Sequence, residues 1–183
     1  MINTIKQEYN KLPELDRKVL RFSGQLIFGE LSKIIILFLF FTFFHMTKEF
    51  VFSTLALIPI RCKIGGLHCR TYLGCLSVTL MIYISAIMIL PATIPLTPIV
   101  ITVLLLCCAS MYIYIGPIIN PTRPKLSSCQ IKQAKSIAAG FIIGYIMLSC
   151  ALHFNHYVIC GVWIIIIQTL QLIAAHIQRK RRS

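Results

Sequence analysis

The sequence contains few acidic residues. Asp and Glu together number five among 183 residues, and none follows Glu49. Paired-carboxylate hydrolysis, aspartyl proteolysis and HExxH-type metal chemistry all need acidic side chains, so these reactions are excluded for most of the chain. Charged residues of both signs make up 13% of the chain. A typical soluble domain carries about 25%, so the composition argues against a water-soluble globule.

Apolar residues and cations dominate instead. Hydrophobic residues make up 57% of the chain, and eighteen Lys and Arg give a net charge of +13. A membrane-spanning helix needs about 20 apolar residues. Apolar runs lie at residues 34–47, 50–60, 76–90, 99–115, 137–152 and 157–177. The shorter runs must extend into flanking polar residues or enter the bilayer only in part. We therefore predict an all-α, polytopic integral membrane protein, with a single domain over residues 1–183.

The placement of the cations predicts the topology. All but Lys48 fall into four groups, at residues 6–33, 61–70, 123–135 and 179–182. Short loops rich in Lys and Arg stay in the cytoplasm, so each apolar stretch between two groups must leave and return. This predicts three hairpins with about six membrane segments, and both termini in the cytoplasm. The hairpins are 34–60, 75–115 and 137–178, joined by cytoplasmic loops 61–74 and 116–136 and followed by a basic tail, 179–183.

Turn residues interrupt each predicted hairpin. Pro91, Pro95 and Pro98 disfavour helix in the second, and the polar residues 153–156 interrupt the third. Lys48 and Glu49 mark the tip of the first. That first stretch is too short for two full crossings at about 1.5 Å per residue, so a shallow re-entrant pair and one long tilted helix both stay open.

The N-terminal region, residues 1–33, carries an amphipathic pattern. Over residues 14–31, Leu15, Val19, Phe22 and Leu26 share one face of a helix, and cations lie on the other faces. Such a helix either lies in the headgroup layer, where cations meet anionic lipid, or packs against the other helices. The lipid bilayer is thus an expected partner. No nucleic-acid-binding module is visible, so the basic excess is assigned to membrane topology.

The loop that ends at Cys75 contains the best candidate chemistry. Residues 61–75 hold one histidine, three thiols, three cations and three glycines. A thiol protease needs a thiolate and an imidazole that accepts and returns a proton. His68 and Cys75 would stand about 10.5 Å apart along one continuous helix, but proton transfer needs roughly 3 Å. The segment must therefore bend. Cys75 lies where an apolar run begins, so it could occupy a helix N-terminus, a position that favours a thiolate.

Other interpretations of the cysteines stay open. Cys69 is a rival nucleophile next to His68, and the whole loop could be solvated and inert. A zinc site would combine Cys62 with these residues and Cys75, but its spacing misses the common short ligand gaps. Cys150 and Cys160 flank the last outer turn, where a disulfide is conceivable. We expect no metal and no cofactor.

Two of these segments together resemble the accessory gene regulator protein B (AgrB) family of Gram-positive bacteria. The first is an Arg-rich stretch followed by Gly, His and a Cys seven residues after the His: Arg61, Gly66, His68 and Cys75. The second is the turn at residues 116–125, which is similar to the family's Ala-Pro-gap-basic-Pro turn, with Gly116 in place of the alanine. Length, segment order and cytoplasmic ends agree over essentially the whole chain.

The resemblance implies a membrane cysteine endopeptidase of the bacterial cell membrane, with His68 and Cys75 as catalytic residues. Such proteins cleave the acidic C-terminal tail from a small precursor peptide through an acyl-enzyme. The peptide then closes into a thiolactone or lactone, a quorum-sensing signal. Family analogy also points to a homodimer.

Charge complementarity suggests which residues bind the precursor. The cations expected to hold the acidic tail are Arg61, Arg70, Arg123 and Lys125, and Gly66 of the family motif completes the expected substrate-binding residues. Two rival functions remain: a non-enzymatic membrane transporter or peptide-export module, and a related peptidase with a different peptide substrate.

Overall fold

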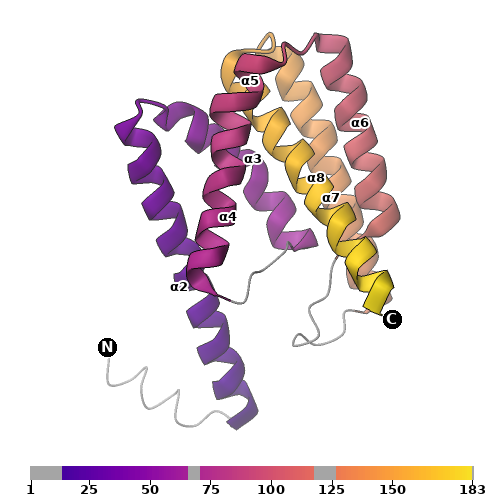
Figure 1. Cartoon of the computed structure of the whole chain (residues 1–183). Helices are drawn as coiled ribbons and strands as arrows, with labels where there is room; N and C mark the ends of the chain where they lie inside the picture. Colours follow the sequence, from indigo (N-terminus) through magenta and orange to yellow (C-terminus); the bar gives the residue numbers. More distant parts are fainter. Residues whose placement is uncertain (1–13, 66–70, 118–126, 183) are drawn as a thin grey trace. The chain divides into compact units, whose positions relative to one another are not determined.

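The computed structural model describes residues 14–65, 71–117 and 127–182 (Figure 1). Every element within these ranges is helical, and they contain no strand, which confirms the all-α prediction. The chain divides into two compact units, residues 1–40 and residues 41–183. Most of helix α2 (Glu14–Phe43) belongs to the first unit, and the second unit holds all the later helices.

Helix α2 is longer than the amphipathic segment from which it was predicted. It begins directly after Pro13 and runs without a break past Ile34 to Phe43. The boundary expected between residues 33 and 34 therefore does not end a helix. No proline or glycine lies near that boundary to stop helix propagation, and the apolar residues that follow favour helix.

The turn of the first hairpin lies between the end of α2 and the start of α3 (Thr47–Ile64), and not at the predicted tip, Lys48 and Glu49. His45 has a φ of 58°, and the Met46 N–H donates to the Phe41 carbonyl at 2.9 Å. Stacking of the Phe41 and Phe50 rings, with centroids 5.3 Å apart, fixes this turn. One long helix over residues 34–60 is thus wrong. Glu49 lies in the first turn of α3, where a negative charge suits the helix dipole.

The second hairpin contains an irregular first helix. Helix α4 (Tyr72–Ile84) passes into a π-helix, η1 (Ser85–Ile89), and then into α5 (Leu90–Thr93). Pro91 does not interrupt this helix, contrary to prediction. Pro91 has no N–H to donate to the carbonyl four residues back. The π turn before it is wider than an α turn, and in it the Leu90 N–H donates to the Ser85 carbonyl. This wider turn accommodates the missing hydrogen bond. The chain leaves the helix only at residues 94–97, and Pro98 starts α6 (Pro98–Ile115).

The turn of the third hairpin lies where it was predicted, whereas its first helix begins at Ser128, inside the expected loop 116–136. Helix α7 (Ser128–Ala151) begins at a capping box formed by Ser127 and Gln130, and α8 (His156–Arg182) follows a short turn. In that turn, His153 and Phe154 adopt positive φ angles of 50° and 51°. Four helical stretches within the described ranges are long and apolar enough to span a membrane, so the expected count of six is not confirmed. They are Tyr72–Thr93, Pro98–Ile115, Ser128–Ala151 and His156–Gln178.

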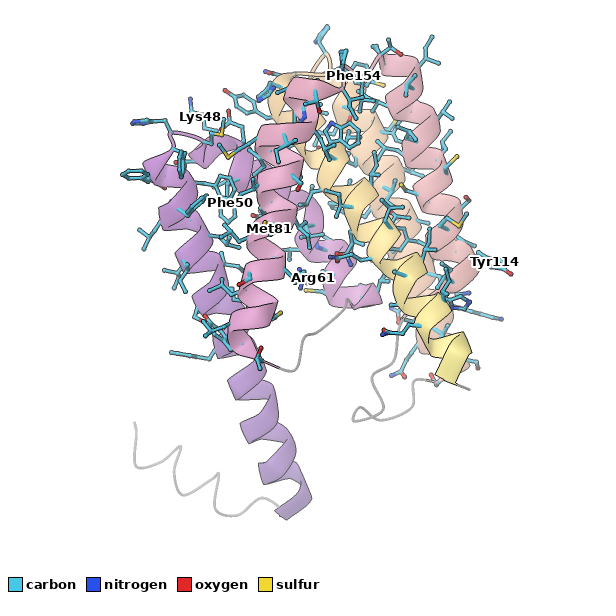
Figure 2. All side chains as sticks on the ribbon, in the orientation of Figure 1. Lys48, Phe50, Arg61, Met81, Tyr114 and Phe154 are labelled. Atoms are coloured by element: carbon cyan, nitrogen blue, oxygen red, sulfur yellow. The ribbon has the colours of Figure 1, made fainter. Side chains whose placement is uncertain are left out.

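The helices of the second unit run up and down. Helix α8 packs against α3 and α6, and α7 packs against the same two helices. The end of α3, the start of α4, the end of α6, the start of α7 and the end of α8 all lie at one end of this unit (Figure 1). Figure 2 shows Arg61 and Tyr114 toward that end and Lys48 and Phe154 toward the other. The loops predicted to be basic and cytoplasmic therefore leave from a common end.

A close approach in the middle of the bundle requires glycine. A Cβ atom on Gly161 of α8 would collide with the Tyr145 hydroxyl of α7 and lie 3.5 Å from the Ala56 Cβ of α3. Tyr145 is held in place because its hydroxyl donates to the Val158 carbonyl at 2.9 Å. Gly161 thus allows three helices to meet.

We predict that Gly161→Ala destabilises the protein by about 1–3 kcal/mol, the usual cost of overpacking. The measurement is the thermal midpoint of the purified protein in detergent, followed by size-exclusion chromatography. Gly144→Ala on α7 is the matched control, because a Cβ there would meet nothing within 4 Å. Equal midpoints for the two variants would contradict the close contact.

Candidate functional site

Cys75 lies in the first turn of a capped helix. The Thr71 hydroxyl oxygen accepts from the Gly74 N–H at 3.2 Å, and the Cys75 N–H donates to the Thr71 carbonyl at 3.1 Å. Thr71 itself has extended backbone angles, as an N-cap residue does. These bonds fix the start of α4, so the chain enters this helix four residues before the thiol. Partial positive charge at the N-terminus of a helix favours an anion such as a thiolate.

The Cys75 side chain is buried, with 5% of its surface exposed. One turn further along α4, Thr79 donates its hydroxyl to the Cys75 carbonyl at 2.8 Å. Cys62, near the end of α3, is an exposed free thiol by contrast. Cys75 therefore combines a helix-start position with shelter from bulk water, and Cys62 lacks both.

The other side of the loop begins at Gly65, which caps α3. Gly65 has a φ of 82°, a conformation that favours glycine, and its N–H donates to the Arg61 carbonyl at 2.9 Å. The Gly65 carbonyl accepts from Nε2 of Gln168 on α8 at 3.2 Å. Arg61 is half-buried and Lys63 is exposed. Both cations occupy the last turn of α3, where positive charge is favourable.

Several predicted site residues lie outside the described residues, namely Gly66, His68, Arg70, Arg123 and Lys125, and so does the rival nucleophile Cys69. The structure places Arg61 and Cys75 and the two flanks of the loop. It contains no cluster of three His, Cys, Asp or Glu side chains within the described ranges. Two of the four ligands of the alternative zinc site are outside those ranges. Cys150 and Cys160, considered for a disulfide, are both free thiols.

The turn that resembles the family's Ala-Pro turn begins at a second glycine cap. Gly116 has a φ of 75°, and its N–H donates to the Tyr112 carbonyl at 3.1 Å. A Cβ on Gly116 would also collide with the Lys135 side chain, whose Nζ donates to the Tyr114 carbonyl at 3.2 Å. Gly116 in place of alanine is therefore a consequence of this backbone conformation.

Lys135 also borders a hollow between α6 and α7. The hollow measures about 470 Å³ and is lined by Ile113, Lys132, Lys135, Ser136, Ala139, Gly140 and Ile143. It lies next to the end of α6 and the start of α7, so its two lysines add to the positive charge at the end of the bundle that holds Arg61. In the sequence, both lysines belong to the basic group at residues 123–135 that predicts the topology, so they were not among the expected site residues.

Helices that are long and apolar define an integral membrane protein of the all-α class. A sequence model of the accessory gene regulator B family matches residues 1–172. The chain is also 30% identical over 167 residues to an AgrB-like protein of Clostridium beijerinckii, across 90% of this chain and 82% of that protein. The chain therefore belongs to the accessory gene regulator B family, whose members take part in autoinducer peptide processing. No solved structure matches it.

We predict that Thr71→Ala loosens the first turn of α4, because the helix loses its side-chain cap. Loss of such a cap costs about 1 kcal/mol, which corresponds to roughly fivefold faster hydrogen exchange at the amides it protects. Amide exchange read by mass spectrometry should show this at Gly74 and Cys75. Thr71→Ser keeps the hydroxyl and should exchange like the wild type. Thr97→Ala removes the equivalent cap of α6 and should leave α4 unchanged.

Proposed function

We propose that this protein is a membrane cysteine endopeptidase that cleaves the C-terminal tail of a small peptide precursor and promotes its cyclisation. The observation that supports this best is the buried Cys75 thiol in the first turn of a capped helix, at the same end of the bundle as the basic residues of α3 and α7. Family membership supports a role in autoinducer peptide processing. We assign the site to the cytoplasmic face, with both termini on that side.

The first stage is acyl transfer to the enzyme. His68 takes the proton of the Cys75 thiol, and the thiolate attacks a carbonyl carbon of the precursor. The peptide C–N bond breaks, and His68 returns the proton to the nitrogen of the departing tail. A thioester between Cys75 and the rest of the precursor remains.

The second stage closes the ring. A cysteine within the precursor gives its proton to His68 and attacks the thioester. A new thioester forms inside the peptide, the bond to Cys75 breaks, and the Cys75 sulfur recovers a proton. A serine in place of that cysteine gives a lactone. An internal nucleophile held close can reach an effective molarity of about 10⁵ M or more, and a buried thioester at Cys75 limits attack by water.

The backbone around Cys75 restricts where the oxyanion can bind. The N–H groups of Gly74 and Cys75 are already bonded to Thr71. The donors must therefore come from other groups, and the Leu73 N–H in the same helical turn is one candidate. Preorganised donors of this kind are a large contribution to acyl transfer.

The transporter alternative has less support. Membrane transporters usually place ionisable side chains in the bundle interior. In the described part of the second unit, the buried polar side chains are all neutral: Ser53, Thr54, Thr79, Ser149, Gln168 and Thr169. A related peptidase with a different peptide would use the same site, and a short neighbouring gene for a precursor with an internal cysteine and an acidic tail decides between the two.

We predict that Cys75→Ala and His68→Ala each abolish tail release, with a loss of at least about a thousandfold. The assay is co-expression with the candidate precursor, followed by mass spectrometry of the released tail and the cyclic product. Cys69→Ala and Cys62→Ala are matched thiol controls and should keep most of the activity. Processing that survives Cys75→Ala overturns the assignment.

We further predict that Arg61 helps to hold the acidic tail. Arg61→Glu should weaken processing by up to roughly fivefold, since a partly exposed ion pair contributes up to about 1 kcal/mol. A precursor in which one tail carboxylate is replaced by Lys should recover part of the loss with Arg61→Glu. Lys48→Glu is the control, because Lys48 lies toward the opposite end of the second unit (Figure 2). An equal effect of the two reversals would contradict direct contact with the tail.

A further inference from the structure

Gln168 is an amide buried within the most apolar part of α8. It follows four consecutive isoleucines and a run of apolar residues, yet only 3% of its surface is exposed. Burying an amide without a hydrogen bond costs several kcal/mol on transfer scales that lack a partner. Polar residues inside membrane-spanning segments are expensive and often functional. Gln168 therefore needs a specific reason to be there.

The partner of Gln168 is distant in sequence. Its Nε2 donates to the Gly65 carbonyl at 3.2 Å, a contact between residues 103 positions apart. Three buried hydroxyls in this unit bond within their own helix: Thr79 to Cys75, Ser149 to Tyr145 and Thr169 to Ile165. Gln168 instead connects α8 to the end of α3.

Gly65 is thereby held at both of its backbone groups. Its N–H is bonded to Arg61 and its carbonyl to Gln168, and its positive φ sets the direction in which the chain leaves α3. On the other side, Thr71 is fixed by its bonds to Gly74 and Cys75. The five residues between these two anchors include His68.

We propose that Gln168 is a positioning residue that holds the Gly65 end of this loop to α8, so that the imidazole of His68 meets the thiol of Cys75. The inference deepens the proposed function and rests on it. Gln168 does not touch the reacting atoms, and its effect must pass through His68. A residue of equal size without an N–H donor would fill the same space and leave the Gly65 carbonyl without this partner.

The test measures alkylation of Cys75 by iodoacetamide in the full-length protein reconstituted in nanodiscs, with each cysteine resolved by peptide mass spectrometry. Gln168→Met keeps the side-chain length and removes the donor. It should slow Cys75 alkylation at least fivefold, close to the rate of His68→Ala. Gln168→His restores an N–H donor and should recover part of the rate. Gln171→Met, three residues further along α8, should behave as the wild type.

The double variant separates positioning from packing. If Gln168 acts through His68, Gln168→Met should add nothing to the slowing caused by His68→Ala. An equal slowing in both backgrounds, or a wild-type rate for Gln168→Met alone, overturns the proposal. Alkylation of the exposed Cys129 thiol reports whether each variant is folded and reconstituted alike.

Failure of the proposed function gives a different result. If His68→Ala leaves both Cys75 alkylation and tail release unchanged, the Cys-His pair itself is wrong. If His68→Ala lowers both and Gln168→Met lowers neither, only the role of Gln168 is wrong.

Discussion

The structure depends on one constraint: a backbone N–H or C=O in the lipid hydrocarbon must find its hydrogen-bond partner within the protein. Helices meet this requirement internally, so the apolar segments of this chain are helical. The unpaired groups are then confined to the helix ends. In the second unit these ends are capped by side chains at Thr71, Thr97 and Ser127. The candidate chemistry lies at one of these ends.

The two basic loops leave the bundle in similar ways. Helix α3 ends at Gly65 and α6 ends at Gly116, and both glycines have a positive φ. In each case a long polar side chain from a different helix donates to a carbonyl near the end: Gln168 to Gly65, and Lys135 to Tyr114. The chain is therefore tied down where it leaves the helix on the way to a cationic loop. Such ties give a loop a defined starting direction even though the bundle core is apolar and non-directional.

Much of the architecture could be predicted from the sequence, because apolar runs and turn residues are local signals. The last hairpin, with its turn after Ala151, and the helix start before Cys75 follow directly from such signals. The end of α2 could not be placed, since the apolar residues from Ile34 to Phe44 contain no helix breaker and the break depends on the packing of Phe41 against Phe50. The predicted interruption at Pro91 was wrong because a π turn can accommodate a proline within a helix.

The candidate site was predictable only in part. The motif predicts Cys75 and its neighbours as candidate site residues by residue type and spacing, and the helix start before Cys75 is consistent with that role. Gln168 was not found, although a polar residue directly after four consecutive isoleucines is a visible signal. Its partner lies 103 residues away in sequence, and a pairing of that range cannot be read from periodicity. The position of Lys132 and Lys135 beside a hollow likewise depends on how α6 packs against α7.

The π-helix has a consequence for how the helix that carries Cys75 can vary. One extra residue in a helical turn rotates everything beyond it by about 100°. The residues beyond the π turn are therefore rotated relative to those of α4, and both η1 and α5 contact α8. Substitutions that change how η1 and α5 pack against their neighbours therefore need not change the position of Cys75 in α4. The sequence of α4 and the sequence of η1 and α5 can thus change independently during evolution, although they form one continuous helical stretch.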